Sequence, residues 1–191
     1  MAAPGGSGPI GPYPPRVADD DEAHDHYDRL RRRVLWSFPS GLYLVGSRAT
    51  IDGVDRQNLM TLNWATQVSF DPKLVGIGVE QTAVTHELIT AGRVFTLATI
   101  SREDRAIVRK FTKPVEIDEA ASTANGFELT YAVTGAPMLT SAVAYVDCEV
   151  RESIVLGGHT FFVGEVVDAA FRAEEDTEVL RMEDTRLNYG G

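Results

Sequence analysis

The sequence has little of what three large classes of protein need. Its 191 residues include a single cysteine, Cys148, which excludes an intrachain disulfide and a cysteine-based metal cluster. Lys and Arg number 18 against 28 Asp and Glu, and this net charge of −10 argues against binding to nucleic acid or anionic lipid. No apolar run approaches the roughly 20 residues that cross a bilayer, and the N-terminal residues lack a signal-peptide pattern. We therefore expect a cytoplasmic protein with no nucleic-acid or membrane partner.

The composition is sufficient for one folded domain with an N-terminal extension. Hydrophobic residues make up 43% of the chain, which is normal for a globular core. Residues 1–28 are instead rich in Gly, Pro and acidic side chains, so we predict a flexible arm there and a domain over 29–191. His24 and His26 lie in this arm, and two imidazoles without a scaffold are a weak metal signal. We expect no metal site.

Short segments of alternating polarity dominate the remaining chain and predict β-strands. The expected strands cover 41–51, 94–100, 127–135, 142–156, 158–172 and 178–182, with Gly157-Gly158 as the turn of one hairpin. Helices are expected over 27–36, 82–91 and 101–111, with Gly92 as a C-terminal cap. A polar connector over 54–58 and an irregular region over 113–126 complete the prediction. The pattern indicates a mainly β fold, an antiparallel barrel with a few peripheral helices.

The segment from Asn58 to Gly92 is the centre of the predicted site. Two strands joined at Asp71-Pro72 are followed by a helix whose start is rich in hydroxyl groups. Small and polar residues (Thr61, Asn63, Ala65) alternate with bulky ones along the first strand. The helix N-terminus offers unpaired N–H groups and a favourable dipole, so it is suited to an anion. Together these features predict a site for a flat, phosphorylated cofactor.

Each of these residues also has a structural interpretation. Thr82 and Thr85 are equally explained as helix-capping hydroxyls, and Trp64 as a core aromatic residue. Lys110 is most simply a charge that complements a helix dipole, and His86 is expected to be exposed. His159 is as readily a hairpin residue as a functional one. Cys148, on an alternating strand, is expected to be buried and inert.

Several motifs, taken in order, resemble the flavin reductase-like family of FMN-binding split barrels, which includes flavin reductases and flavoredoxins. They are Met60-Thr61-Leu62-Asn63-Trp64, Val68-Ser69-Phe70-Asp71-Pro72, Thr82-Ala83-Val84-Thr85-His86-Glu87-Leu88-Ile89, Gly92-Arg93-Val94-Phe95 and residues 157–166. The ordered set is more specific than any single motif. The resemblance implies a Greek-key-like antiparallel split β-barrel, FMN as the cofactor and a homodimer.

The resemblance also implies roles for individual residues. Those expected along the isoalloxazine ring and ribityl chain are Thr61, Asn63, Trp64, Ala65 and Thr66. Gln81, Thr82 and Thr85 are expected to hold the 5′-phosphate. Lys110 and Phe111 are expected to approach from the end of the 101–111 helix. His159 is expected near the open face of the flavin, where a nicotinamide must stack, and is the candidate catalytic residue.

The implied function is that of an NAD(P)H-dependent flavin reductase, which transfers a hydride from NADH or NADPH to FMN. A monooxygenase component that receives the reduced flavin is a possible partner. The family often has Asp at the position of Gly158 and Asn at the position of Ala98. The Gly158 difference motivates an alternative, a flavoredoxin-like FMN-binding electron carrier that does not use NAD(P)H directly. Use of a deazaflavin in place of FMN is a third interpretation.

Overall fold

The computed structural model describes residues 13–185, and they belong to two compact units. The first unit contains helix α1 (Asp21–Trp36), and the second spans Ser40–Arg186. Helix α1 begins at Asp21 rather than at the predicted residue 27, because the Asp20 carboxylate accepts the N–H of Ala23 at 2.8 Å. Residues 21–28 of the predicted arm are therefore helical, while residues 1–12 of that predicted arm lie outside the described residues.

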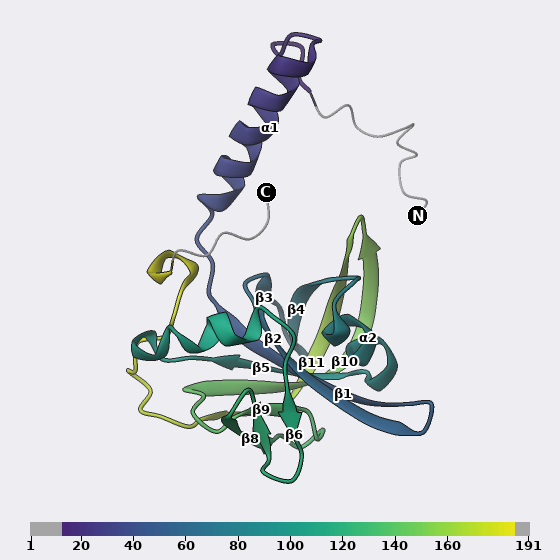
Figure 1. Ribbon diagram of the computed structural model, residues 1–191, viewed down its shortest axis with the longest axis vertical. Helices are drawn as coiled ribbons and strands as arrows, with labels where there is room; N and C mark the ends of the chain where they lie inside the picture. Colours follow the sequence, from purple (N-terminus) through teal and green to yellow (C-terminus); the bar gives the residue numbers. More distant parts are fainter. Residues whose placement is uncertain (1–12, 186–191) are drawn as a thin grey trace. The chain divides into compact units, whose positions relative to one another are not determined.

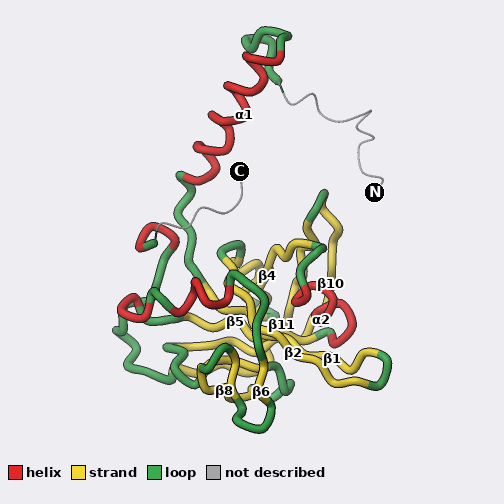
Figure 2. Tube along the Cα trace, in the orientation of Figure 1, coloured by secondary structure: helices red, strands yellow, loops and turns green. Residues whose placement is uncertain are grey.

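The second unit is built from antiparallel strands, as Figures 1 and 2 show. One sheet has the order β2-β1-β5-β10-β11-β4-β3 and the other β6-β7-β8-β9. The strands of the first sheet are β1 (Tyr43–Ile51), β2 (Val54–Leu62), β3 (Ala65–Phe70), β4 (Lys73–Glu80), β5 (Val94–Thr99), β10 (Ala144–Leu156) and β11 (His159–Phe171). Those of the second are β6 (Ile117–Asp118), β7 (Thr123–Ala124), β8 (Phe127–Tyr131) and β9 (Pro137–Leu139). The predicted mainly antiparallel β fold is confirmed.

Strands β1 and β2 form a tight hairpin where the sequence suggested a longer connector. Asp52 and Gly53 have φ values of 52° and 75°, and Ile51 pairs directly with Val54. A two-residue turn with both φ values positive matches the twist of paired strands, and Asp-Gly favours it. The expected connector 54–58 is thus the first half of β2, which pairs with β1 as far as Tyr43 and Leu62.

The central segment contains a break that the alternating pattern did not reveal. Strand β2 ends at Leu62 and β3 begins at Ala65, so Asn63 and Trp64 lie outside both strands. The carbonyl of Trp64 accepts the N–H of Gly78 at 2.9 Å, which holds the break against β4. As a result Asn63 is only 8% exposed and Trp64 is 39% exposed. The expected small polar face and the expected core position of Trp64 are therefore wrong.

The helical segments of this unit also differ from the prediction in detail. Helix α2 covers Val84–Gly92, and Arg93 rather than Gly92 adopts the left-handed cap conformation. Gly92 is required for another reason, because a Cβ there would lie 1.9 Å from the carbonyl oxygen of Arg48. The predicted helix 101–111 is two 3-10 helices, η1 (Arg102–Asp104) and η2 (Ile107–Phe111). Only η2 has buried side chains, those of Ile107, Val108 and Phe111.

Two further segments differ from the prediction: 178–182 is less regular than expected and 113–126 is more regular. The expected strand 178–182 makes only isolated bridges, from Val179 to Ser101 and from Arg181 to Gly41, before η3 (Met182–Asp184). The expected irregular region 113–126 contains the short strands β6 and β7. Val179 and Arg181 contact distant segments only at single residues, whereas β6 and β7 pair with each other and β7 with the adjacent β8. Strand pairing, rather than the polarity pattern of each stretch, decides both outcomes.

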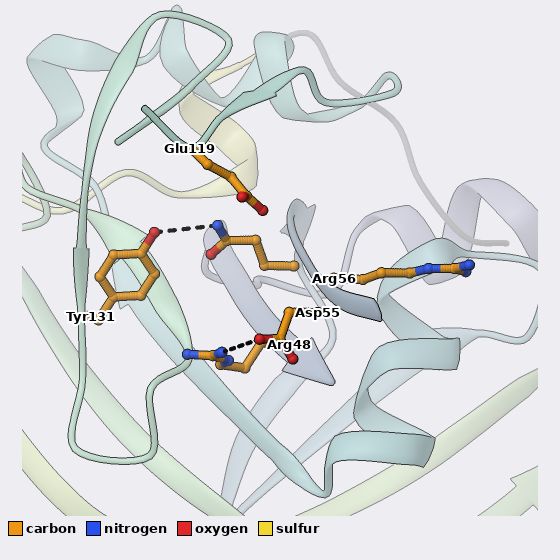
Figure 3. Close-up of a pocket in the computed structure, with 6 residues that line it drawn as sticks. Arg48, Asp55, Arg56, Glu119 and Tyr131 are labelled. Atoms are coloured by element: carbon orange, nitrogen blue, oxygen red, sulfur yellow. Dashed lines mark hydrogen bonds and ion pairs between the residues drawn. The ribbon is translucent and has the colours of Figure 1, made fainter. Parts of the chain in front are cut away.

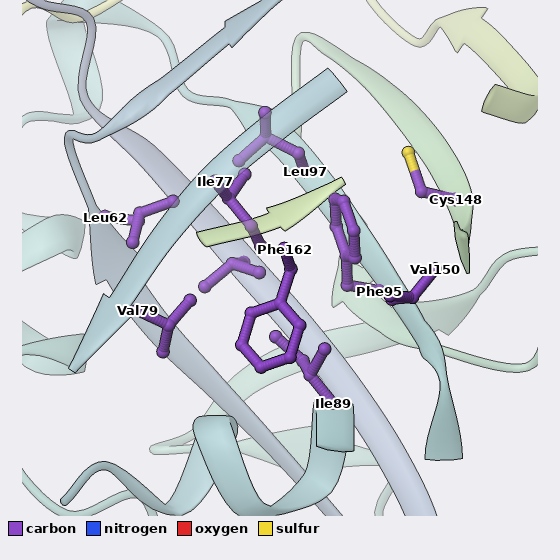
Figure 4. Packing of buried hydrophobic residues seen from close by; sticks show 10 residues of the cluster. Leu62, Ile77, Val79, Ile89, Phe95, Leu97, Cys148, Val150 and Phe162 are labelled. Atoms are coloured by element: carbon purple, nitrogen blue, oxygen red, sulfur yellow. The ribbon is translucent and has the colours of Figure 1, made fainter. Parts of the chain in front are cut away.

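A core cluster of apolar side chains joins α2 to β1, β2, β4, β5, β10 and β11 (Figure 4). Its buried members are Val45, Leu62, Ile77, Val79, Ile89, Phe95, Leu97, Cys148, Val150 and Phe162. A separate cluster around Phe111 and Leu139 joins η2 to the small sheet. The site described below is therefore supported on strands whose inner faces are fully packed.

Cys148 is expected to be unreactive in the folded protein. Burial raises the pKa of its thiol to about 12, with the neighbouring Asp147 carboxylate acting in the same direction. Since the thiolate is the reactive form, labelling at about pH 8 should be slow. Titration with a chromogenic disulfide should detect essentially no thiol in native buffer and the single thiol of the chain in denaturant. Rapid reaction in native buffer would mean that β10 opens locally.

Candidate functional site

The end of β4, the start of α2 and the start of β11 lie together. His159 pairs with Glu80 across β11 and β4, and the Gln81 N–H donates to the carbonyl of Gly158 at 3.0 Å. The turn that connects β10 to β11 is thus next to the loop that enters α2. The helix N-terminus predicted to bind an anion and His159 are therefore neighbours in the fold, although they are far apart in the sequence.

The N-terminus of α2 carries unused hydrogen-bond donors. Ala83 is the N-cap residue, with extended backbone and no side-chain cap. Among residues 13–185, no acceptor is found for the backbone N–H groups of Thr82, Val84 or Thr85. The first turn of any helix leaves such groups unpaired. Thr82 is exposed, and neither threonine caps the helix, so the capping interpretation is wrong.

The Thr85 side chain has a different role from the predicted one. Thr85 is fully buried, and its hydroxyl accepts a hydrogen bond from the Asn58 amide at 2.8 Å. This bond ties α2 to β2. The Thr85 hydroxyl therefore cannot reach a cofactor in this structure, and its backbone N–H is buried with the rest of the residue.

The rings of Trp64 and His159 form a wall next to this helix start, and Asn63 precedes Trp64 in the chain. The rings of Trp64 and His159 lie 4.6 Å apart between centroids and are tilted by 46°. Trp64 covers Gly78, where a Cβ would be 3.2 Å from the indole. No hydrogen bond is found for the Asn63 amide within the described chain, and no side-chain polar atom there is both fully buried and unpaired. The Asn63 amide thus keeps access to solvent with its donor and acceptor unused.

The other residues predicted along the ring contribute less. The Thr61 hydroxyl donates to the carbonyl of Val108 at 2.6 Å, which fastens η2 to β2. Ala65 packs against the core. Thr66 is exposed, and its hydroxyl makes only a long 3.3 Å bond to the carbonyl of Gln67. Of these three side chains, the structure leaves Thr66 most available.

Lys110 and Phe111, the two site residues predicted at the end of the 101–111 segment, have different environments. Phe111 is 1% exposed and its ring lies 5.9 Å from that of Phe127, so its side chain belongs to the core and not to a cofactor site. Lys110 is exposed, and its carbonyl accepts a 2.8 Å hydrogen bond from Asn125. The correction for Phe111 follows from packing of η2 against the small sheet, which local sequence does not encode.

His86 and Gln81 make contacts that the sequence did not suggest. His86 is partly buried, contrary to expectation, and its Nε2 lies 2.8 Å from the hydroxyl of Thr160. Burial lowers the pKa of His86, so the imidazole is neutral at pH 7. The Gln81 amide nitrogen donates to the carbonyls of Gly157 at 3.2 Å and His159 at 3.4 Å. Both donors of this amide are therefore engaged away from any phosphate.

A separate hollow of about 290 Å³ lies at the far end of the β1–β2 hairpin (Figure 3). It is lined by Arg48, Asp55, Arg56, Gln57, Glu119 and Tyr131. Arg48 pairs with Asp55 at 3.7 Å and Arg56 with Glu87 at 3.9 Å, so its two cations are each balanced by a carboxylate. None of the predicted site residues lines this hollow, and it is not the predicted flavin site.

Over residues 13–185, no group of three or more His, Cys, Asp or Glu side chains is arranged to hold a metal ion. None of the helices in the same stretch has both the length and the apolar character needed to span a bilayer.

Comparison with known proteins gives a consistent result. The profile of the family described as "Flavin reductase like domain" matches residues 35–191. The chain is 33% identical over 161 residues to an NADH-dependent FAD reductase of Streptomyces globisporus, covering 81% of this chain and 83% of that one. It is 30% identical over 138 residues to the reductase component of a 4-nitrophenol 4-monooxygenase/4-nitrocatechol 2-monooxygenase of Rhodococcus opacus, covering 72% and 69%.

The fold agrees with these relatives. The solved structure of the NADH:FAD oxidoreductase from Streptomyces globisporus C-1027 superposes with a TM-score of 0.70 at 27% identity, covering 87% of this chain and 94% of that one. The predicted split-barrel fold is thereby confirmed. On the family match and this identity, the chain belongs to the flavin reductase-like family, as its ordered motifs predicted.

Proposed function

We propose that the protein is an NAD(P)H-dependent flavin reductase that binds the FMN portion of a flavin. One observation carries this proposal: an open helix N-terminus, with unpaired N–H groups at Thr82 and Val84, adjoins the wall formed by Trp64 and His159. An anion seat next to a partly exposed aromatic surface fits a ligand with a phosphate at one end and a flat ring at the other. The similarity to named NADH-dependent reductases supports the same interpretation.

The phosphate would be held by the backbone at the start of α2. The exposed N–H groups of Thr82 and Val84 and the Thr82 hydroxyl would supply donors, and the helix dipole favours negative charge there. Neutral His86 adds no positive charge to this seat. The exposed side chain of Lys110 is proposed to attract the phosphate at longer range. FMN and FAD share this phosphate, so the seat accounts for FMN binding without requiring contacts to an adenylate.

The ring would lie along the break between β2 and β3. The free amide of Asn63 offers one donor and one acceptor to the polar edge of a flavin, and Thr66 offers a hydroxyl. A flavin held here would supply the redox chemistry of hydride transfer from a nicotinamide. The residues of this chain orient the two ligands and exclude water between them. His159, beside Trp64, is the proposed contact for the nicotinamide.

We also propose that reduced flavin leaves the protein for a separate monooxygenase, and that the protein is a homodimer. The first proposal is supported by the Rhodococcus opacus relative, which is named as the reductase component of a monooxygenase. The second rests on the family resemblance of the ordered motifs. Size-exclusion chromatography with light scattering tests the dimer directly.

The reductase proposal is tested by following nicotinamide absorbance with NADH or NADPH in the presence of FMN, FAD, riboflavin or a deazaflavin. We expect turnover with FMN and at least one nicotinamide. Flavin binding without turnover by either nucleotide would reject the reductase and favour the electron carrier, which is motivated by Gly158 at a position where the family often has Asp. Reduction of bound flavin by a ferredoxin-type donor alone would then identify that carrier. Binding of the deazaflavin in preference to FMN would change the cofactor but not the fold.

A further inference from the structure

The tip of the β10–β11 hairpin has almost no packing of its own. A Cβ placed on Gly157 or Gly158 would meet no atom within 4 Å. The residues before the turn are exposed, Val155 at 71% and Leu156 at 58%. The hairpin extends beyond the rest of the sheet in Figures 1 and 2. Its position therefore depends on specific contacts rather than on burial of apolar surface.

Gln81 supplies those contacts from the other side of the site. Its backbone N–H donates to the carbonyl of Gly158 at 3.0 Å. Its side-chain amide donates to the carbonyls of Gly157 at 3.2 Å and His159 at 3.4 Å. A single residue thus bonds to three consecutive carbonyls of the turn. It does so from the loop that enters α2, 76 residues away in the chain from Gly157.

The last of the three residues bonded by Gln81 is His159, the first residue of β11. Its ring lies 4.6 Å from that of Trp64, and the next residue, Thr160, is held to His86 at 2.8 Å. We propose that Gln81 is a positioning residue for the nicotinamide substrate: it holds the Gly157–His159 turn so that the His159 ring stays against Trp64. This inference rests on the proposed reductase function.

The geometry separates this role from that of a phosphate ligand. An amide nitrogen has two hydrogens, and both carbonyl contacts of Gln81 use them. The remaining group of the amide is its oxygen, an acceptor that would face a phosphate unfavourably. Thr82, next in the chain, is exposed and has an uncommitted hydroxyl. Two adjacent residues therefore have different roles: Gln81 positions the nicotinamide side of the site, and Thr82 contacts the phosphate.

Gln81→Met tests the proposal, because methionine has nearly the same length but donates no hydrogen bond. The backbone bond to Gly158 is retained, so the hairpin should loosen rather than unfold. We expect the KM for the nicotinamide to rise roughly 2- to 10-fold, as befits loss of neutral hydrogen bonds, with a smaller change in kcat. The Kd for FMN should stay within about 2-fold. The matched control, Thr82→Val, should show the reverse, a weaker FMN Kd with an unchanged nicotinamide KM.

A second readout needs neither flavin nor turnover. In a Trp36→Phe background Trp64 is the only tryptophan, and its indole lies against the His159 ring at 4.6 Å between centroids. We expect Gln81→Met in this background to increase acrylamide quenching of Trp64 fluorescence, because a loosened His159 covers the indole for less of the time. His159→Ala should increase the quenching at least as much, and serves as the reference in which no ring covers the indole.

The outcomes distinguish this inference from the proposed function. An increase in FMN Kd in Gln81→Met, with unchanged nicotinamide KM and unchanged acrylamide quenching of Trp64, would overturn the positioning role and identify Gln81 as a phosphate ligand. A wild-type protein that oxidises no nicotinamide would reject the reductase function. Acrylamide quenching of Trp64 would still decide whether Gln81 holds His159 in place.

Discussion

Val84→Pro is expected to weaken FMN binding by roughly 10- to 100-fold while leaving the fold intact, the loss typical of one hydrogen bond to a charged group. Val84 is the first residue of α2, and its N–H has no acceptor within the described residues. Proline fits this position because its missing N–H is unpaired in the helix anyway. The preceding Ala83 has ψ of 140°, in the extended region that a following proline requires.

Riboflavin provides the control for this variant, because it has the same ring and no phosphate. Its Kd should be the same for wild type and Val84→Pro, and the free energy of unfolding should change little. Fluorescence quenching of the flavin on titration with protein measures both affinities. Equal loss of FMN and riboflavin affinity would mean that the variant disturbs the ring wall. Unchanged FMN affinity would remove the start of α2 from the phosphate site.

Gly46→Ala is expected to destabilise the protein by about 3 kcal/mol or more, at the upper end of overpacking effects. A Cβ on Gly46 would lie 1.8 Å from the carbonyl oxygen of Pro137 and 2.8 Å from the hydroxyl of Thr96. That hydroxyl already donates to the same carbonyl at 2.6 Å in a fully buried position. The small sheet crosses β1 at this point, so the backbone of β9 would have to move and its buried hydrogen bond would be lost.

Urea denaturation followed by circular dichroism measures this effect, with Gly158→Ala as the matched control. A methyl group added at Gly158 would meet no atom within 4 Å, and the φ angle of Gly158 is not positive. Its replacement should therefore change the free energy of unfolding by less than about 0.5 kcal/mol. If both alanine variants were equally stable, the contact between β9 and β1 would be looser than the structure indicates.

The positions assigned to the site differ in how directly they can be tested. Val84→Pro tests a backbone donor of α2, and Thr82→Val tests the Thr82 hydroxyl. Asn63→Leu tests the Asn63 amide and should weaken binding of the flavin ring rather than of the phosphate. Thr85 is unsuitable for such a test, because its hydroxyl bonds to Asn58 and its loss would destabilise the contact between α2 and β2.

The sequence by itself determined the features that depend on neighbours in the chain. Alternating polarity predicted β1, β5, β10 and β11, since side chains of a strand point to opposite faces with a period of two. The Gly157-Gly158 turn and the helix that begins near Thr82 were also readable from local composition. The ordered motifs were sufficient to identify the family, because they record the order of site elements along the chain.

The tertiary structure alone decided what each side chain of the site contacts. Thr85 is buried because Asn58, 27 residues earlier, donates to it, and Phe111 is buried because η2 packs against Phe127. Trp64 faces outward because the chain breaks between β2 and β3, which reverses the expected alternation. The side-chain amide of Gln81 donates to the carbonyl of Gly157, in a hairpin 76 residues away in the chain. Periodicity reports only on the segment that carries it, whereas hydrogen bonds and packing between distant segments determine which groups remain free for a ligand.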